Sequence, residues 1–201
     1  ANLENERSAM LVSALEVLGK ALEMRDPYTF NHAQNVSVIA EKIGKALNWD
    51  LNRLVGIQLA GALHDLGKIS IPLDILNKPG KLSDIEYQLI KGHVENSHSL
   101  IKDIKFPGSL SQTVYQHHER LDGSGYPQGL KKDEITLEAK VLGISDVLES
   151  MTSHRPYRAA LGLDVALEEL EKGSGIKYDP DIVKLVKDMI NENKGKEFWL
   201  N

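Results

Sequence analysis

The sequence has no cysteine, and it has no apolar run long enough to cross a membrane. Without cysteine the chain can form neither disulfide bonds nor thiolate metal sites, and this fits a reducing compartment, so we expect a cytoplasmic protein. No basic segment followed by an apolar one marks a signal peptide. A basic excess is missing too: the formal net charge of −5 argues against general DNA binding, although local cations or metals would still allow a small anionic substrate.

What is present is the composition of a soluble globular protein, with 41% hydrophobic and 26% charged residues among 201. That length suits one domain, or one domain with an extension. The sequence contains no internal repeat and no low-complexity tract. Its first residue is Ala1 rather than Met, from which we expect a processed or excised piece of a longer protein.

Apolar residues recur at spacings of three and four through most of the chain, which predicts an all-α fold without strands. We expect residues 25–191 to form one helical domain. Residues 192–201 form a tail, whose Phe198 and Trp199 pack either on the bundle or on a partner. Residues 1–24 form an amphipathic helix, which is either a core helix or a connector from an upstream sensory domain. A connector of this kind would naturally mediate homodimerisation.

Several helix starts are visible in the sequence. Asp26-Pro27 combines an N-cap residue with proline at the first helical position, and Asp50 is a second N-cap. Ser83-Asp84-Ile85-Glu86 has the form of a capping box, and we expect the helix that it opens to carry His93. These signals divide the chain into helices that can be searched for functional side chains.

His64 and Asp65 end an apolar helix, and they are the strongest local indication of chemistry. Neighbours on a helix point about 100° apart, so both can hold one ion, and the second oxygen of Asp65 can bridge to another. The alternative is a helix-end pair exposed to water. Lys68, one turn later, is either a cation favoured by the helix dipole or a group that stabilises charge on a phosphoryl oxygen. Gly67 is expected to let the chain turn away.

Other histidines fall at positions that can supply the same site. His32 lies on the inner face of its helix, and His117 and His118 are adjacent at the end of another. Asp146 also faces the core, where a carboxylate is costly unless it is paired or bound to a metal. Any one of these is compatible with an ordinary core residue, but five of the seven histidines can feed one metal centre: His32, His64, His93, His117 and His118.

A glycine-rich loop follows the histidine pair and contains Gly125, Tyr126 and Pro127. It could be a mere connection. Its glycines would also allow the backbone to approach a ligand closely, and Tyr126 offers a ring to a base.

In this order and at this spacing, the motifs resemble the HD-GYP family of bacterial phosphodiesterases, from about residue 23 to about residue 190. The resemblance implies an HD-type helical bundle with catalytic roles for Asp65 and Lys68. It also implies substrate contacts from the loop Gly125, Tyr126 and Pro127, and from Arg155 and Arg158, which would bind phosphate. The metal ligands that it implies, with Asp65 as the bridge, are His32, His64, Asp65, His93, His117, His118 and Asp146.

Two positions depart from the family pattern. Some members hold a third metal with a glutamate where this chain has Tyr28, so we expect two metals. Glu149 replaces the usual aspartate; we count it among the substrate-binding residues, with altered positioning of substrate or water. The family suggests iron or manganese, and five imidazoles with two carboxylates also suit nickel or zinc better than magnesium or calcium.

The resemblance therefore implies a metal-dependent phosphodiesterase that opens cyclic di-GMP to linear pGpG, and onward to GMP in some enzymes, by a hydroxide bridging two metals about 3.5–4 Å apart. An alternative is the same chemistry on cyclic GMP-AMP, because nothing in the loop selects guanine over adenine. A third is a signalling module that binds a cyclic dinucleotide or a protein partner and cleaves weakly.

Overall fold

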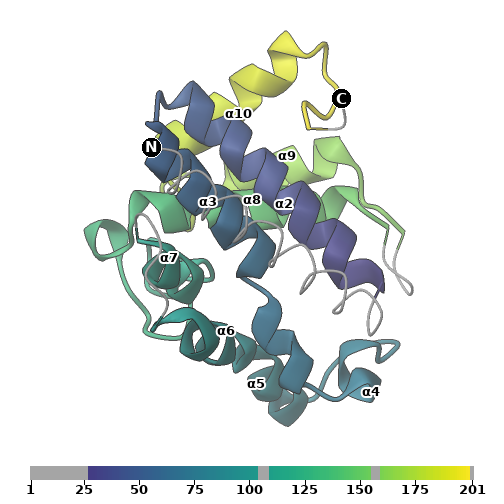
Figure 1. Ribbon diagram of the computed structural model, residues 1–201. Helices are drawn as coiled ribbons and strands as arrows, with labels where there is room; N and C mark the ends of the chain where they lie inside the picture. The colour runs from purple at the N-terminus through teal and green to yellow at the C-terminus, as the bar shows by residue number, and fades with distance from the viewer. Residues whose placement is uncertain (1–26, 104–108, 155–158, 200–201) are drawn as a thin grey trace.

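The computed structural model describes residues 27–103, 109–154 and 159–199, in which helices are the only regular elements (Figure 1). Two isolated bridges, Asp122 with Lys131 and Ser174 with Tyr178, are the only β pairing in this part of the chain. The all-α prediction is thus confirmed. The predicted helix of residues 1–24, and Arg155 and Arg158, lie outside the described residues. The α-helices are α2 (Pro27–Ala46), α3 (Leu51–Leu63), α4 (Leu73–Leu76), α5 (Asp84–Lys91), α6 (His93–Ile101), α7 (Leu110–Gln116), α8 (Leu137–Thr152), α9 (Leu163–Gly173) and α10 (Pro180–Glu192), with 3-10 turns η1 (Leu66–Ser70) and η2 (Lys132–Glu134).

The core forms where α2 packs on α3 and α8, with α9 and α10 closing the bundle behind and above them (Figure 1). The inner face of α2 shows the predicted spacing of three and four, because Val36, Ile39, Ala40 and Ile43 are all fully buried. Burying a large aliphatic side chain of this kind stabilises the fold by about 1.5–3 kcal/mol. This packing fixes the position of α2 and α8, which both carry predicted site residues.

Most helix starts agree with the sequence signals. Asp50 accepts a hydrogen bond from the Arg53 amide at 3.0 Å and caps α3. Ser83 and Glu86 form the predicted capping box of α5. The helix opened by that box is shorter than expected, however: it ends at Lys91, and His93 begins a separate helix after a break at Gly92. Gly92 keeps right-handed helical angles, with φ −59° and ψ −16°, so the break does not depend on the conformational freedom of glycine, and the spacing of apolar residues alone does not report it.

The C-terminal residues that the structure describes pack on the bundle. Phe198 and Trp199 are buried within the main core, and the Lys42 ammonium donates to the Phe198 carbonyl oxygen at 2.5 Å. Of the two alternatives for this tail, packing on the bundle is therefore the one observed.

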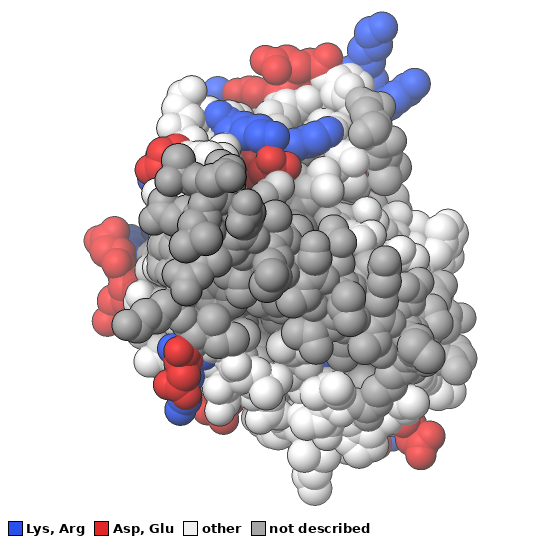
Figure 2. Space-filling view, viewed as in Figure 1, with Lys and Arg blue, Asp and Glu red and all other residues white. Residues whose placement is uncertain are grey.

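The described surface carries mixed charge on the face viewed in Figure 1. Figure 2 shows basic and acidic side chains next to one another along the upper edge of this face, where Figure 1 shows α10. On α10 itself Lys184 pairs with Asp188, and Lys187 pairs with Glu171 of α9. Among the described helices, none combines the length and the apolar character that crossing a bilayer requires.

Candidate metal centre

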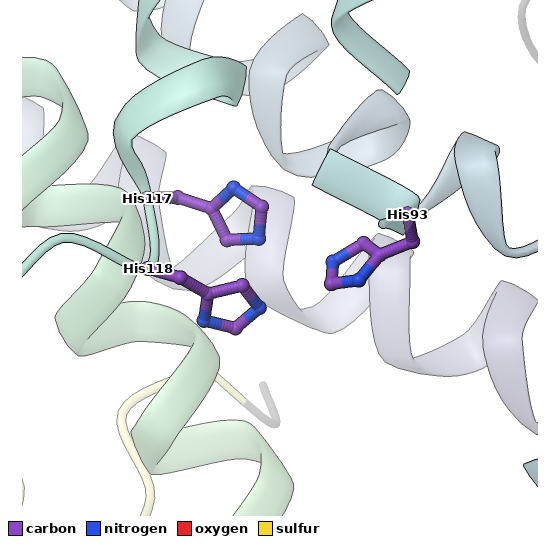
Figure 3. A group of neighbouring side chains, drawn as sticks. All are labelled: His93, His117 and His118. Carbon is purple, nitrogen blue, oxygen red and sulfur yellow. The ribbon is translucent and has the colours of Figure 1, made fainter. Parts of the chain in front are cut away.

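All seven predicted metal ligands meet in one place. His32 comes from α2, Asp146 from α8, and the others come from the ends of α3 and α7 and the start of α6. They form overlapping groups in which all ligand atoms lie within 4.8 Å of one another. One group, shown in Figure 3, is His93, His117 and His118; the others are His32, His64 and Asp146, and His64, Asp65 and His117.

Asp65 stands between the two halves of this cluster. Its Oδ2 lies 3.5 Å from His32 Nε2 and 3.3 Å from His64 Nε2, and its Oδ1 lies 3.3 Å from His93 Nε2. The two oxygens therefore face different imidazoles. This is the arrangement that a carboxylate bridging two ions requires.

Three of the imidazoles are held by backbone carbonyl groups. Nδ1 of His64, His93 and His117 lies 2.8, 2.7 and 2.6 Å from the carbonyl oxygens of Gly61, Ile90 and Val114. Because a carbonyl only accepts, each Nδ1 carries the proton and donates it, which leaves the lone pair on Nε2. All three Nε2 atoms are buried, and within the part of the chain that the structure describes no group hydrogen-bonds to them. A buried polar atom without a partner is costly, and a metal ion would satisfy all three, so these residues fit such an ion.

The charge states also suit a metal centre. Burial lowers the pKa of His93 and His117, and it lowers the pKa of His118 to about 3, so these imidazoles are neutral at pH 7. Burial alone would raise the pKa of Asp65, but His64 and Lys68 hold it well below its ordinary value. His32 does the same for the pKa of Asp146. Neutral imidazoles and ionised carboxylates are the forms that bind metal.

His32 differs from the other predicted ligands. Its Nε2 lies 3.2 Å from Asp146 Oδ1, and its Nδ1 is hydrogen-bonded to Glu149. Burial alone would lower the pKa of His32, but the hydrogen bonds to Asp146 and Glu149 outweigh it and raise the pKa to about 9. Glu149 itself is only 2% exposed and points at His32 rather than into open space. The structure therefore favours a position behind the ligand over the substrate contact expected from the sequence.

Lys68 lies beside the cluster, with its ammonium 2.6 Å from Asp65 Oδ2. Gly67 has a different role from the one expected. Its backbone lacks the positive φ angle that would favour glycine, but a Cβ atom there would lie 2.1 Å from the His93 carbonyl oxygen. Gly67 is therefore needed because η1 packs directly against the start of α6, and this brings Asp65 next to His93.

The loop with Tyr126 closes over the histidine pair. The Tyr126 ring stacks on His118, with 4.7 Å between the ring centroids, and the Lys91 ammonium lies 5.0 Å from the Tyr126 ring. A Cβ atom on Gly125 would lie 2.4 Å from the backbone at Glu119 and Arg120. The close approach that we expected toward a ligand is thus made here to the chain's own backbone.

Two supporting residues were missed by sequence reasoning. Glu119 is buried, and its two carboxylate oxygens accept the Gln128 and Leu130 amides at 2.7 and 2.9 Å, which fixes the loop. Ser97 is fully buried on α6 and joins it to the segment that follows α3. The adjacency of Glu119 to His117 and His118 was the only sequence signal for either residue.

A family model described as HD domain matches residues 16–182. The chain is 31% identical over 183 residues to 3′3′-cGAMP-specific phosphodiesterase 3 of Vibrio cholerae serotype O1, which covers 91% of this chain and 40% of that protein. It is 35% identical over 181 residues to the cyclic di-GMP phosphodiesterase of Thermotoga maritima. This alignment covers 89% of this chain and 49% of that protein. The chain thus spans less than half the length of these two relatives.

A solved structure supports the fold. Bd1817, described as an HDG"Y"P protein from Bdellovibrio bacteriovorus, superposes with a TM-score of 0.65 and 20% sequence identity, over 80% of this chain and 51% of that one. At this identity the likeness concerns the fold alone, and it agrees with the helical bundle described above.

Proposed function

The chain belongs to the HD domain family, as its resemblance to the HD-GYP phosphodiesterases implied, and from this premise we propose that it hydrolyses cyclic di-GMP to linear pGpG. The observation that carries the proposal is the cluster of five imidazoles and two carboxylates with three unsatisfied, buried Nε2 atoms. The relative from Thermotoga maritima, which bears the name cyclic di-GMP phosphodiesterase, supports the choice of substrate.

The cluster would hold two divalent metal ions, iron or manganese by preference. His32, His64, Asp146 and one oxygen of Asp65 would hold the first. The second would be held by the three histidines of Figure 3 with the other oxygen of Asp65. A ligand set dominated by imidazole suits iron, manganese, nickel or zinc better than it suits magnesium or calcium. When bound, such a pair supplies a nucleophile at neutral pH and polarises the phosphodiester.

The chain's own residues orient and complete this chemistry. The Lys68 ammonium, already beside Asp65, would offset negative charge that develops on a phosphoryl oxygen. Gly125, Tyr126 and Pro127 would line the entrance and orient a base, because the Tyr126 ring lies directly against His118. The phosphate-binding roles of Arg155 and Arg158 rest on the resemblance alone. Burial of His64, His93 and His117 lowers the local dielectric constant and strengthens each of these electrostatic interactions.

Cyclic GMP-AMP is the second candidate substrate. The relative from Vibrio cholerae is named as specific for 3′3′-cGAMP and is 31% identical to this chain. Tyr126 offers a ring face, which stacks on any purine and so does not select guanine.

The test is an assay of anaerobically purified protein with both dinucleotides, read by chromatography after metal analysis and with added manganese or ferrous iron. We expect about two metals per chain and cleavage of cyclic di-GMP to pGpG. The double variant His64→Ala/Asp65→Ala should lose turnover, whereas His98→Ala, a histidine outside the cluster, should keep it. Full metal occupancy without cleavage of either dinucleotide would overturn the proposal and favour a binding module.

A further inference from the structure

We propose that Glu149 is a positioning residue, which holds His32 by its Nδ1 atom and thereby sets the metal affinity of the centre. The inference rests on the proposed metal centre but not on the identity of the substrate. It concerns the position where this chain departs from the pattern that its sequence resembles. The glutamate, one methylene longer than the usual aspartate, would then contact the ligand His32 instead of the substrate.

The contacts of Glu149 leave neither oxygen free. Its Oε2 is hydrogen-bonded to His32 Nδ1. Its Oε1 accepts Asn35 Nδ2 at 3.1 Å and the Ser153 hydroxyl at 2.7 Å. Asn35 Nδ2 and the Ser153 hydroxyl both donate to this carboxylate, so the side chain acts as an acceptor and His32 Nδ1 is the donor. A buried carboxylate needs such partners, and all of them are protein groups.

The position of His32 in its helix explains why it needs a carboxylate where His64, His93 and His117 use a backbone carbonyl group. His64 and His117 follow the last residues of α3 and α7, and His93 follows the end of α5. The last carbonyl groups of a helix have no partner within the helix, so they are available to Nδ1 of these three residues. His32 lies inside α2, where the carbonyl group one turn earlier already accepts a helical hydrogen bond.

A side chain from another helix must therefore orient His32, and Glu149 reaches it from α8, 117 residues further along the chain. The contact also ties α2 to α8, the two helices that supply His32 and Asp146. A carboxylate that accepts from the outer nitrogen of a metal-binding imidazole fixes the ring and raises its basicity as a ligand. Asn35 and Ser153 in turn hold the carboxylate in place.

The experiment measures the Mn²⁺ affinity of metal-free protein by titration calorimetry, without any dinucleotide. Glu149→Gln keeps the shape of the side chain and removes its charge, and we expect metal binding about 10- to 100-fold weaker. The matched control is Glu138→Gln, which changes a glutamate on the same helix that pairs with Arg53 outside the cluster, and it should bind Mn²⁺ unchanged. Asn35→Ala keeps the charge of Glu149 but removes one of the hydrogen bonds that hold its carboxylate in place. It should weaken Mn²⁺ binding less than Glu149→Gln does.

Kinetics separate positioning from substrate contact. If Glu149 positions His32, Glu149→Gln lowers kcat at limiting metal and leaves KM nearly unchanged, and excess Mn²⁺ restores part of the activity. Unchanged Mn²⁺ affinity together with a raised KM would overturn the inference in favour of substrate contact. Should Glu149→Gln fail to fold by circular dichroism, Asn35→Ala and Glu149→Asp decide, and native metal affinity in both would also overturn it. Failure of the unaltered chain to bind Mn²⁺ would instead refute the proposed metal centre.

Discussion

At the scale of single residues, the role of Ser97 can be tested by one substitution. Ser97 links two of the segments that carry predicted metal ligands. Its hydroxyl accepts the Gly67 amide and donates to the His64 carbonyl oxygen, both at 2.7 Å. Ser97→Ala would leave a buried donor and a buried acceptor without partners. We expect the free energy of unfolding to fall by about 1–3 kcal/mol, measured by urea denaturation.

The control for this prediction is Ser99→Ala, because Ser99 lies on the same helix and is exposed. It should leave the urea midpoint within experimental error. Equal stability of the two variants would mean that the hydrogen bonds of Ser97 contribute nothing to the fold.

That these seven side chains lie together could be predicted from the sequence, because metal chemistry restricts which residue types can serve as ligands and the resemblance implied their order. The supporting residues could not. The roles of Gly67 and Ser97 depend on how closely η1 approaches α6, and that of Glu149 depends on the spacing between α2 and α8. No local pattern in the sequence reports a distance between helices.

At the scale of elements, the loop over the histidine pair is held by one carboxylate. Glu119 accepts the amides of Gln128 and Leu130, and both of its oxygens are used. Glu119→Gln keeps the shape but turns one acceptor into a donor that faces an amide. We expect faster hydrogen exchange at one or both of these amides, because the loop opens locally without global unfolding.

A suitable comparison is Glu134→Gln, which changes an exposed glutamate that accepts the Lys131 amide at 2.8 Å in the next turn. It should leave the exchange of Gln128 and Leu130 unchanged. Native exchange rates in Glu119→Gln would show that stacking of Tyr126 on His118 suffices to hold the loop.

Element boundaries were predictable where a side chain marks them. Asp50 and the box of Ser83 with Glu86 begin helices as expected. The break at Gly92 was not, since a glycine is also tolerated inside a helix, and the packing of η1 against α6 accompanies the break.

At the scale of the whole molecule, the predicted ligands come from α2 and α8 and from the ends of α3, α6 and α7, so an ion bound among them would connect these helices. The class of the fold was predictable because the spacing of buried residues is a local property of each helix. The packing of Phe198 and Trp199 was left open, because an apolar tail carries no information about which surface receives it.

Because a bound ion would connect these helices, we predict that metal stabilises the fold and that the stabilisation depends on pH. Binding to the folded state alone raises the free energy of unfolding by about 2.7 kcal/mol when free metal is at about 100 times Kd. In the metal-free fold the pKa of His32 is raised to about 9, so at neutral pH a metal ion must displace its proton. His93, His117 and His118, whose pKa values are lowered, release none. Metal affinity should therefore rise about tenfold per pH unit between about pH 6.5 and pH 8, and level off near pH 9.

The sign for the metal-free protein is the opposite. A raised pKa contributes stability that is complete below the ordinary value of 6.5 and is lost as the pH rises through about 9. Thermal melts with and without Mn²⁺, taken at each pH, separate the two effects, because the difference between the curves reports metal binding alone. That difference should grow as the pH increases. A difference that stays constant across this range would show that His32 is already neutral before metal binds, and that its hydrogen bonds to Glu149 and Asp146 do not retain the proton.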